Sequence, residues 1–323
     1  MIADVEWANR CVDGNTPARG PRDGRTVSVA RRLNGSWVRV MEAVFAAGIV
    51  LTVRADWAPG GDQGERFHGT KAGQVREDNG LAMKLVWCPP GTFKMGSPKE
   101  EDGRGEDETQ VDVKLTGFWL GRHEVTQSEW QRVMKTTPWA GEESVKEGPN
   151  YPASWVSWED AMRFCGQLNA AEQRAGRLSA GWRYALPTEA QWEYACRAGT
   201  KSRFAFGDRE ADLGKYAWFK ENTEAVGEDY PHEVGLKMPN LWGLYDMNGN
   251  VVEWCRDYYV DRVPGGADPE VRAYRTIFRV IRGGGQSSLS GECRAASRWA
   301  AAYVQRVSMG FRVALVPPAL SRK

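Results

Sequence analysis

Residues 243–254 constrain the fold more than any other stretch, and they read Gly-Leu-Tyr-Asp-Met-Asn-Gly-Asn-Val-Val-Glu-Trp. Two acidic side chains, Asp246 and Glu253, stand among glycines and asparagines between bulky apolar residues. A hard cation such as calcium takes oxygen ligands from carboxylates and main-chain carbonyls, and a Gly- and Asn-rich turn lets several carbonyls converge on one point. The alternative is a tight Asn-Gly turn that leads into a strand, with both acids solvated. The stretch therefore predicts either an ion site built from the backbone or a simple turn.

The composition predicts a loop-rich protein rather than a helix bundle. The chain has 15 Trp and 36 Gly among 323 residues, with few long apolar periodic segments. Large aromatic rings can hold irregular loops together, so short elements joined by long loops are expected. Because 43 Lys and Arg balance 42 Asp and Glu, the formal net charge is only +1. Nothing in the charge indicates a nucleic-acid partner.

The cysteines and histidines argue against the common metal and redox sites. The six cysteines are scattered without a CxxC pair, so neither a zinc ribbon nor a thioredoxin-like site is expected. Isolated buried thiols are the simplest interpretation. His68, His123 and His232 lie far apart in the sequence, so multi-histidine metal or acid–base sites are poorly supported.

The first 80 residues are predicted to be a disordered or signal-peptide-like leader followed by a linker. Residues 10–35 are rich in Arg, Gly, Asp and Pro, which indicates disorder. Residues 31–58 resemble a secretory signal peptide, with a positive flank, an apolar run at residues 41–53 and a small-residue end. Export to the periplasm, surface or medium is expected, and a short amphipathic or buried helix in a cytoplasmic protein is the alternative. The apolar run is too short for a transmembrane span.

Residues 83–316 have the texture of a folded domain, and residues 317–323 are predicted to be a tail. Residues 83–96 read as a strand, a Pro-Pro-Gly turn and a strand, and residues 111–115 alternate as a half-buried strand does. Three helix starts carry capping signals, in which a side-chain oxygen accepts a hydrogen bond from an otherwise unpaired amide. The capping residues are Thr126, Ser157 and Thr188. Beyond residue 200 no comparable signal follows, so strands and loops must organise the rest.

Seven short motifs in the folded part occur in a fixed order. They lie at residues 89–97, 124–126, 156–161, 186–194, 243–251, 282–284 and 310–313, and include Pro-Pro-Gly-Thr-Phe-Lys-Met-Gly-Ser, Leu-Pro-Thr-Glu-Ala-Gln-Trp-Glu-Tyr, Arg-Gly-Gly and Gly-Phe-Arg-Val. Together they resemble the formylglycine-generating enzyme, or sulfatase-modifying factor, family. The resemblance covers residues 83–316 and implies a variant of the C-type lectin fold, which is α+β with much irregular structure.

The resemblance also implies a structural calcium ion in the stretch at residues 243–254. The family's ligand positions fall on the Asp246 and Glu253 side chains and on the Gly249 and Val251 carbonyls. The calcium site is therefore favoured over the bare turn. A second family calcium site would lie near Trp218, but the sequence does not place its acidic ligand.

Oxidase activity is a separate question. Family members that act as oxidases convert a cysteine in a sulfatase peptide to formylglycine, with oxygen and a copper ion held by two cysteine thiolates after the Arg-Gly-Gly motif. Here those positions fall near Ser288 and Ser290, and Cys293 is the only local thiol. Serine hydroxyls stay protonated at neutral pH and are poor copper ligands, so copper is not expected. Gly285 and Val252 are further departures, because Ser and Trp are usual there.

These observations favour a recognition or accessory module without copper oxidase activity. The family's cleft receives an extended peptide, so the expected partner is an extended peptide or protein segment, such as that of a sulfatase. The candidate cleft residues are Arg282, Ser287, Ser288, Ser290, Cys293, Arg298 and Trp299. The alternative is an active formylglycine-generating oxidase. A serine hydrolase is disfavoured, because no base is linked to these serines in the sequence.

Overall fold

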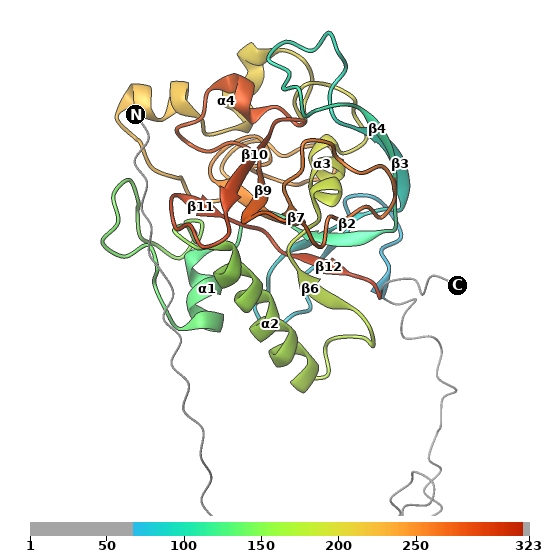
Figure 1. Ribbon diagram of the computed structural model, residues 1–323. Coiled ribbons are helices and arrows are strands. Elements are labelled where there is room, and N and C mark those ends of the chain that lie inside the picture. The colour runs from blue at the N-terminus through green and yellow to red at the C-terminus, as the bar shows by residue number, and fades with distance from the viewer. Residues whose placement is uncertain (1–66, 319–323) are drawn as a thin grey trace, which may run out of the picture. The chain divides into compact units, whose positions relative to one another are not determined.

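The computed structural model describes residues 67–318, which form an α+β fold of three small sheets and four α-helices (Figure 1). The sequence therefore predicts the fold class correctly. The signal-peptide-like residues 31–58 and residues 319–323 of the predicted tail lie outside the described residues. Among the described helices, none is long and apolar enough to cross a membrane.

The sheets join strands that lie far apart in the sequence. Their orders are β1-β2-β5-β12-β6, β10-β9-β7-β11 and β3-β4-β8. The strands are β1 Val75–Arg76, β2 Leu85–Cys88, β3 Gly91–Met95, β4 Val111–Leu115, β5 Phe118–Gly121, β6 Arg183–Ala185, β7 Val252–Tyr258, β8 Gly266–Ala267, β9 Phe278–Arg282, β10 Arg298–Ala302, β11 Met309–Gly310 and β12 Ala314–Val316. The β11–β7 and β4–β8 pairs are parallel, and the others are antiparallel. The predicted Pro-Pro-Gly turn carries the chain from the first sheet to the third.

The three predicted capping signals each begin a helix. These helices are α1 Gln127–Met134, α2 Trp158–Arg174 and α3 Glu189–Arg197. Each has a complete capping box: at α1, for example, Glu129 N donates to Thr126 Oγ1 at 3.2 Å, and Thr126 N donates to Glu129 Oε2 at 2.8 Å. After residue 200 the helices among the described residues are only the one-turn α4, Leu213–Tyr216, and short 3₁₀ turns. The helix predictions are confirmed.

Buried aromatic rings hold the irregular parts together, as the composition suggests. Trp130, Trp139, Trp192 and Trp254 are almost completely buried. Trp130 stacks on Phe164 of α2, with ring centroids 5.7 Å apart, so the neighbouring helices α1 and α2 share an aromatic contact (Figure 1). All nine residues of α3 are buried, which makes this helix part of the core rather than a surface cover.

The folded unit extends further toward the N-terminus than the predicted boundary at residue 83. Strand β1 pairs with β2 through Val75 and Val86, and Trp119 Nε1 donates to the Phe67 carbonyl at 2.7 Å. Residues 67–80, predicted as linker, therefore pack against the first sheet. Backbone pairing attaches them, together with ring contacts of Phe67 and His68 with Trp182, and their otherwise polar composition hides this.

The capping box of α1 makes stability depend on pH. Burial raises the pKa of Glu129 from 4.5 to about 7, although hydrogen bonds from Thr126 oppose the shift. Between these two values the folded protein keeps a proton that the unfolded chain releases, so this residue's contribution to stability is complete below pH 4.5 and is lost as the pH rises to 7. Glu129→Gln keeps the capping bond without the charge. Between pH 4.5 and 7 the free energy of unfolding of this variant should rise relative to that of wild type, by up to about 1.4 kcal/mol for each unit of the pKa shift. Its melting temperature should rise with it.

Thermal melts of wild type and variant at pH 4.5 to 8 measure this difference, with Glu142→Gln, at an exposed loop position, as the control. A constant gap between wild type and Glu129→Gln at every pH would contradict the expectation.

Candidate functional site

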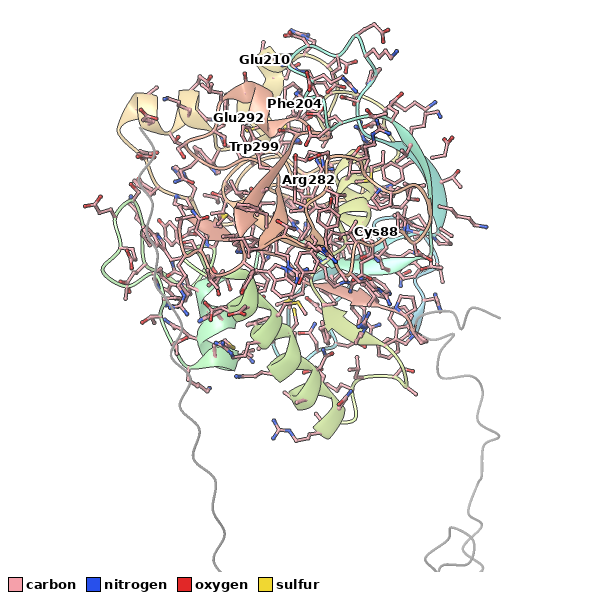
Figure 2. All side chains as sticks on the ribbon, in the orientation of Figure 1. Cys88, Phe204, Glu210, Arg282, Glu292 and Trp299 are labelled. Atoms are coloured by element: carbon pink, nitrogen blue, oxygen red, sulfur yellow. The ribbon has the colours of Figure 1, made fainter. Side chains whose placement is uncertain are left out.

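A cavity of about 910 Å³ forms the main candidate site. Its walls come from residues 102–108, from residues 289–294 and from strand β10. Glu210, Glu292 and Trp299 lie close to one another in the upper part of Figure 2, and all three line this cavity, which we call the cleft. Trp299 is 50% exposed, which is unusual for a large aromatic side chain and typical of a contact surface.

Buried ion pairs fix the walls of the cleft. Arg294 donates to Glu108 with two bonds of 2.7 and 2.8 Å and to Glu101 at 2.6 Å, which anchors the acidic loop. Burial alone would raise the pKa of Glu108, but the hydrogen bonds from Arg294 and Ser97 outweigh it and hold this pKa below its usual value. The acidic loop at residues 100–108 is thus fixed to the folded core by Arg294.

A second pair anchors β10 to α3. Arg298 donates to both carboxylate oxygens of Glu189, at 2.7 and 2.9 Å. Its other side faces Asp107, which also accepts a 2.6 Å hydrogen bond from the Tyr259 hydroxyl. Planar two-point contacts of this kind fix direction as well as distance.

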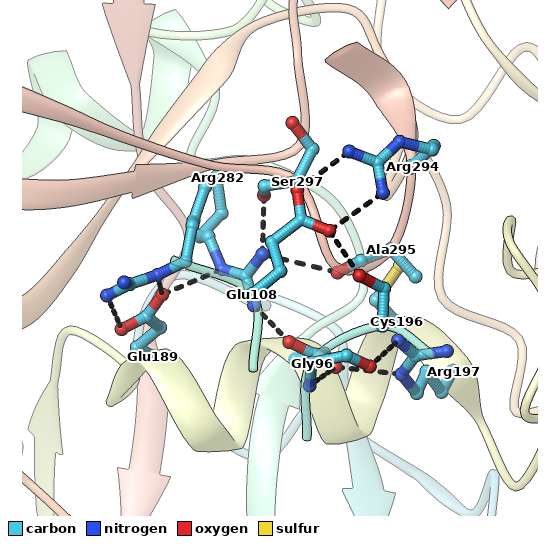
Figure 3. Close-up of polar contacts among 12 residues, drawn as sticks. Gly96, Glu108, Glu189, Cys196, Arg197, Arg282, Arg294, Ala295 and Ser297 are labelled. Atoms are coloured by element: carbon cyan, nitrogen blue, oxygen red, sulfur yellow. Dashed lines mark hydrogen bonds and ion pairs between the residues drawn. The ribbon is translucent and has the colours of Figure 1, made fainter. Parts of the chain in front are cut away.

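Arg282 is the buried centre of this region (Figure 3). Its guanidinium pairs with Glu193 of α3, lies 3.4 Å from Glu189, and donates to the Ala295 and Ser297 carbonyls. Glu193 is shared with Arg197 of the same helix. Arg282 therefore positions the cleft segment from beneath instead of facing the cleft.

The predicted cleft residues divide into two groups. Ser290, Arg298 and Trp299 line the cavity, and the Ser290 hydroxyl donates to Glu210 at 2.5 Å. The other four, Arg282, Ser287, Ser288 and Cys293, do not line it. Cys293 is fully buried in a cluster that contains Phe204 and Leu213, and burial raises the pKa of its thiol.

Strand β10 leaves part of its backbone unpaired beside the cleft. Among residues 67–318 it is an edge strand of its sheet and pairs only with β9. Tyr303 N donates to the Ile277 carbonyl at 3.0 Å, so these two residues form a hydrogen-bonded pair. Trp299 and Ile281 are paired in the same register. Bonded and non-bonded pairs alternate along antiparallel strands, so Trp299 bonds inward to β9 while the N–H and C=O of Ala300 point outward. Ala300 is exposed and lines the cleft.

Residues 243–251 form a tight, largely buried loop, and residues 252–254 begin β7. Asp246 and Asn250 adopt left-handed backbone conformations, with φ of 58° and 70°. A Cβ at Gly249 would lie 2.3 Å from the Trp218 carbonyl, so only glycine fits there. Asp246 Oδ2 accepts from Gly235 N at 2.7 Å, but its buried Oδ1 has no hydrogen-bond partner in the described part of the chain. An orphaned carboxylate oxygen in such a loop fits an oxygen-ligated cation.

The predicted ligand Glu253 already has strong partners. Its two oxygens accept hydrogen bonds from Arg312, and one also accepts from Trp192 Nε1 at 2.8 Å. Glu253 therefore neutralises Arg312 in the core. Less negative charge is available to a cation at Glu253 than at Asp246.

The sequence reasoning missed Glu124, which lies beside Asp246. Burial and then the charge of Asp246 raise the pKa of Glu124, and one of its oxygens, Oε2, is buried without a partner. Burial also raises the pKa of Asp246, to about 6. Glu124 belongs to the Glu-Val-Thr motif and Arg312 to the Gly-Phe-Arg-Val motif, but the sequence alone assigned neither residue a role. The fixed order of the motifs was the signal that could have linked Glu124 and Arg312 to the loop at residues 243–251.

Comparisons with known proteins extend over most of the described residues. Residues 71–316 match the family model described as the sulfatase-modifying factor enzyme 1-like domain. The chain is 27% identical over 255 residues to the chaperone protein LppX of Paenibacillus barcinonensis, which covers 67% of this chain and 83% of that protein. It is 27% identical over 231 residues to the formylglycine-generating enzyme of Mus musculus, covering 54% of this chain and 58% of that relative's length. The structure of PvdO from Pseudomonas aeruginosa is similar, with a TM-score of 0.67, 29% identity, and coverage of 76% and 99%.

The buried position of Arg282 predicts a large loss of stability on its removal. Arg282→Met leaves Glu193 and the Ala295 and Ser297 carbonyls without their central donor. Breaking a buried, hydrogen-bonded ion pair costs about 3–5 kcal/mol, so urea denaturation should show a loss of this size. Arg163→Met removes a pair whose arginine side chain is 57% exposed, and it should cost less than about 1 kcal/mol. Equal losses in the two variants would contradict the role assigned to Arg282.

Proposed function

Because the chain belongs to the sulfatase-modifying factor enzyme 1-like family, we propose that its domain is a calcium-stabilised module that recognises an extended peptide or protein segment without copper oxidase chemistry. The observation that carries this proposal is the free edge of β10 at the cleft. An extended segment can add to such an edge as a further strand, so that main-chain hydrogen bonds give affinity and neighbouring side chains give specificity. Trp299 supplies an exposed aromatic anchor beside that edge.

The charge of the cleft favours a basic segment. Its lining has twice as many carboxylates as guanidinium groups: Asp102, Asp107, Glu108, Glu210, Glu221 and Glu292 against Arg203, Arg294 and Arg298. All three arginines are paired with carboxylates, and among the described residues Glu221 and Glu292 are the lining acids that form no ion pair. A partner that carries Lys or Arg would therefore be attracted, and an acidic partner would be repelled.

The side chains near the expected copper positions do not fit a copper site. Ser290 is a hydroxyl that donates to Glu210, and this hydrogen bond lowers the pKa of Glu210. Copper(I) prefers soft thiolates. The nearby Cys293 is buried away from the cleft, and desolvation keeps its thiol protonated. The alternative is an oxidase that generates formylglycine. It is supported by the similarity to the formylglycine-generating enzyme of Mus musculus.

Calcium is the second part of the proposal. Asp246, with the Gly249 and Val251 carbonyls, would hold the ion, and Glu253 would contribute from its pair with Arg312. The ion would supply positive charge to a loop in which Asp246, Glu124 and Glu253 face a single arginine. Its role would be structural, because it would relieve the repulsion between these carboxylates.

The signal-peptide-like residues 31–58 support a further proposal that the protein is exported. N-terminal sequencing of the mature protein tests this: a start after residue 58 agrees with export, and a retained leader contradicts it.

Peptide binding is tested with short alternating Val/Arg and Val/Glu peptides by fluorescence anisotropy. The basic peptide should bind wild type more tightly than the acidic one. Ala300→Pro removes an outward N–H at a position where an edge strand tolerates proline, and it should weaken binding about tenfold or more. Trp299→Ala should weaken binding too, whereas Leu241→Ala, which removes another exposed apolar side chain, should not.

Unchanged affinity in Ala300→Pro would rule out pairing at the β10 edge. The absence of any binding by wild type would overturn the recognition function as proposed.

Calcium binding is tested by thermal melting in calcium and in chelator. At a concentration about 100 times its dissociation constant, a ligand adds about 2.7 kcal/mol. For a domain of this size that raises the melting temperature by about 5–10 °C. Asp246→Asn should lose this gain, yet melt higher than wild type in chelator, because it removes repulsion with Glu124. A wild-type midpoint that is the same in both buffers would contradict the calcium site.

A further inference from the structure

A smaller cavity, of about 250 Å³, adjoins the cleft. Its lining consists of Lys220, Glu221, Glu224, Ala225 and Leu289, and two of these residues, Glu221 and Leu289, also line the cleft. The two spaces therefore meet at Glu221 and Leu289, and we call the smaller one the side pocket. Sites for whole small-molecule ligands usually measure about 300–1,000 Å³. The side pocket is below that range, so it suits one side chain of a larger partner.

Hydrogen bonds between two distant segments form the side pocket. Lys220 N donates to the Ser288 carbonyl at 3.0 Å. The hydroxyl of Thr223, which is fully buried, donates to the Gln286 carbonyl at 2.6 Å. These bonds fix the 3₁₀ turn at Lys220–Asn222 against the segment that carries Leu289. The side pocket is therefore formed in the protein alone, and a partner that enters it has little extra chain to order.

The apolar part of the side pocket comes from Leu289 and Ala225. The Leu289 side chain is 54% exposed, although its backbone N–H donates to Glu292 Oε2 at 2.9 Å and so holds the turn in place. Glu292 lies near Trp299, at the cleft (Figure 2). Ala225 is exposed as well. Long charged side chains pack their methylene stems on apolar groups of this kind while the charged end stays near water.

The net charge of the side pocket comes from Glu221. Lys220 Nζ lies 3.3 Å from Glu224 Oε2, so the charges of these two lining residues offset one another. Glu221 is exposed, and among residues 67–318 its side chain forms no ion pair and no hydrogen bond. A cation that enters from the cleft therefore meets an available carboxylate where the two spaces join.

We propose that the side pocket selects a lysine or arginine side chain of the segment that binds in the cleft. The stem of that side chain would pack on Leu289 and Ala225, and its charged end would pair with Glu221. Side chains of an extended segment point alternately to its two sides, so one of them can enter the side pocket while the main chain pairs at Ala300. This inference rests on the proposed recognition function and adds which side chain is selected and by which residues.

The test uses short Thr/Val peptides that are identical except for one central residue, which is lysine, norleucine or glutamate. Norleucine has an apolar stem like that of lysine but no charge. Fluorescence anisotropy with the full chain should show the lysine peptide binding about fivefold more tightly than the norleucine peptide, the size expected for one solvent-exposed ion pair. The glutamate peptide should bind most weakly.

Substitutions at the two shared residues separate charge from apolar contact. Glu221→Gln should remove the preference for lysine over norleucine and leave the affinity for the norleucine peptide unchanged. Leu289→Ala should weaken both peptides by a similar factor, whereas Leu241→Ala, at another exposed leucine, should weaken neither. Because Glu221 and Leu289 are exposed, all of these variants should melt at the wild-type temperature.

Charge reversal gives the sharpest comparison. Glu221→Lys should lower the ratio of lysine-peptide to glutamate-peptide affinity at least about tenfold. Glu142→Lys changes the net charge of the protein by the same amount at an exposed position that lines neither cavity, and it should leave this ratio within about twofold of wild type.

Failure of the side pocket and failure of the cleft give different results. If the lysine peptide binds and Ala300→Pro weakens it, but the lysine preference is the same in wild type, Glu221→Gln and Glu221→Lys, the recognition function stands and the side-pocket inference is overturned. If the preference responds to Glu221 as expected but Ala300→Pro binds as wild type does, the side pocket stands and pairing at β10 is overturned. No binding of any peptide to wild type would overturn both.

Discussion

Buried pairs between arginine and carboxylate are the interaction on which the rest of this structure depends. Arg282, Arg294 and Arg312 are almost completely buried, and each meets at least one glutamate from a distant part of the chain. Long loops offer few regular hydrogen bonds to hold them in place. A guanidinium supplies five donors in a fixed plane, so one arginine can fix a carboxylate and several carbonyls at once. Taking these charges out of water is costly, and only complete pairing offsets the cost. The loops therefore adopt the geometry in which each buried guanidinium donor has an acceptor.

The same rule explains why the two candidate sites are where they are. In the cleft the arginines are paired with carboxylates, which leaves the free backbone of β10, Trp299, Glu221 and Glu292 to face a partner. At the loop before β7 the balance is the opposite, because three carboxylates face Arg312 alone. One site has the features of a surface for an extended segment, and the other lacks positive charge. Together they support a recognition domain whose shape depends on an ion.

Local signals in the sequence predicted local structure well. Thr126, Ser157 and Thr188 gave the helix starts, because a capping box is complete within four residues. The order of seven motifs gave the family, which the match over residues 71–316 confirms. The buried loop at residues 243–254 is present, but its calcium ligands remain a prediction.

Contacts between distant residues could not be predicted in the same way. Glu124 and Asp246 are separated by more than a hundred residues, and only the fold brings their carboxyl groups together. Arg282 begins the Arg-Gly-Gly motif and Cys293 follows it, in the segment where cleft residues are expected, yet both side chains are buried in the core. Sequence spacing gives the position of a residue along the chain but not the side of the backbone that its side chain takes in a loop. The attachment of residues 67–80 was hidden for a related reason, since it rests on backbone pairing with β2 and on ring contacts with the distant Trp182.

The most direct test of the account is an oxidation assay on a cysteine-containing sulfatase peptide. The purified protein is incubated with the peptide, copper, a reductant and oxygen, beside a formylglycine-generating enzyme as positive control, and the peptide is followed by mass spectrometry. The account predicts that the cysteine stays unchanged while the control converts it. Conversion to formylglycine by this protein would contradict the account, because the two expected thiolate positions fall near Ser288 and Ser290 and the nearby Cys293 is buried.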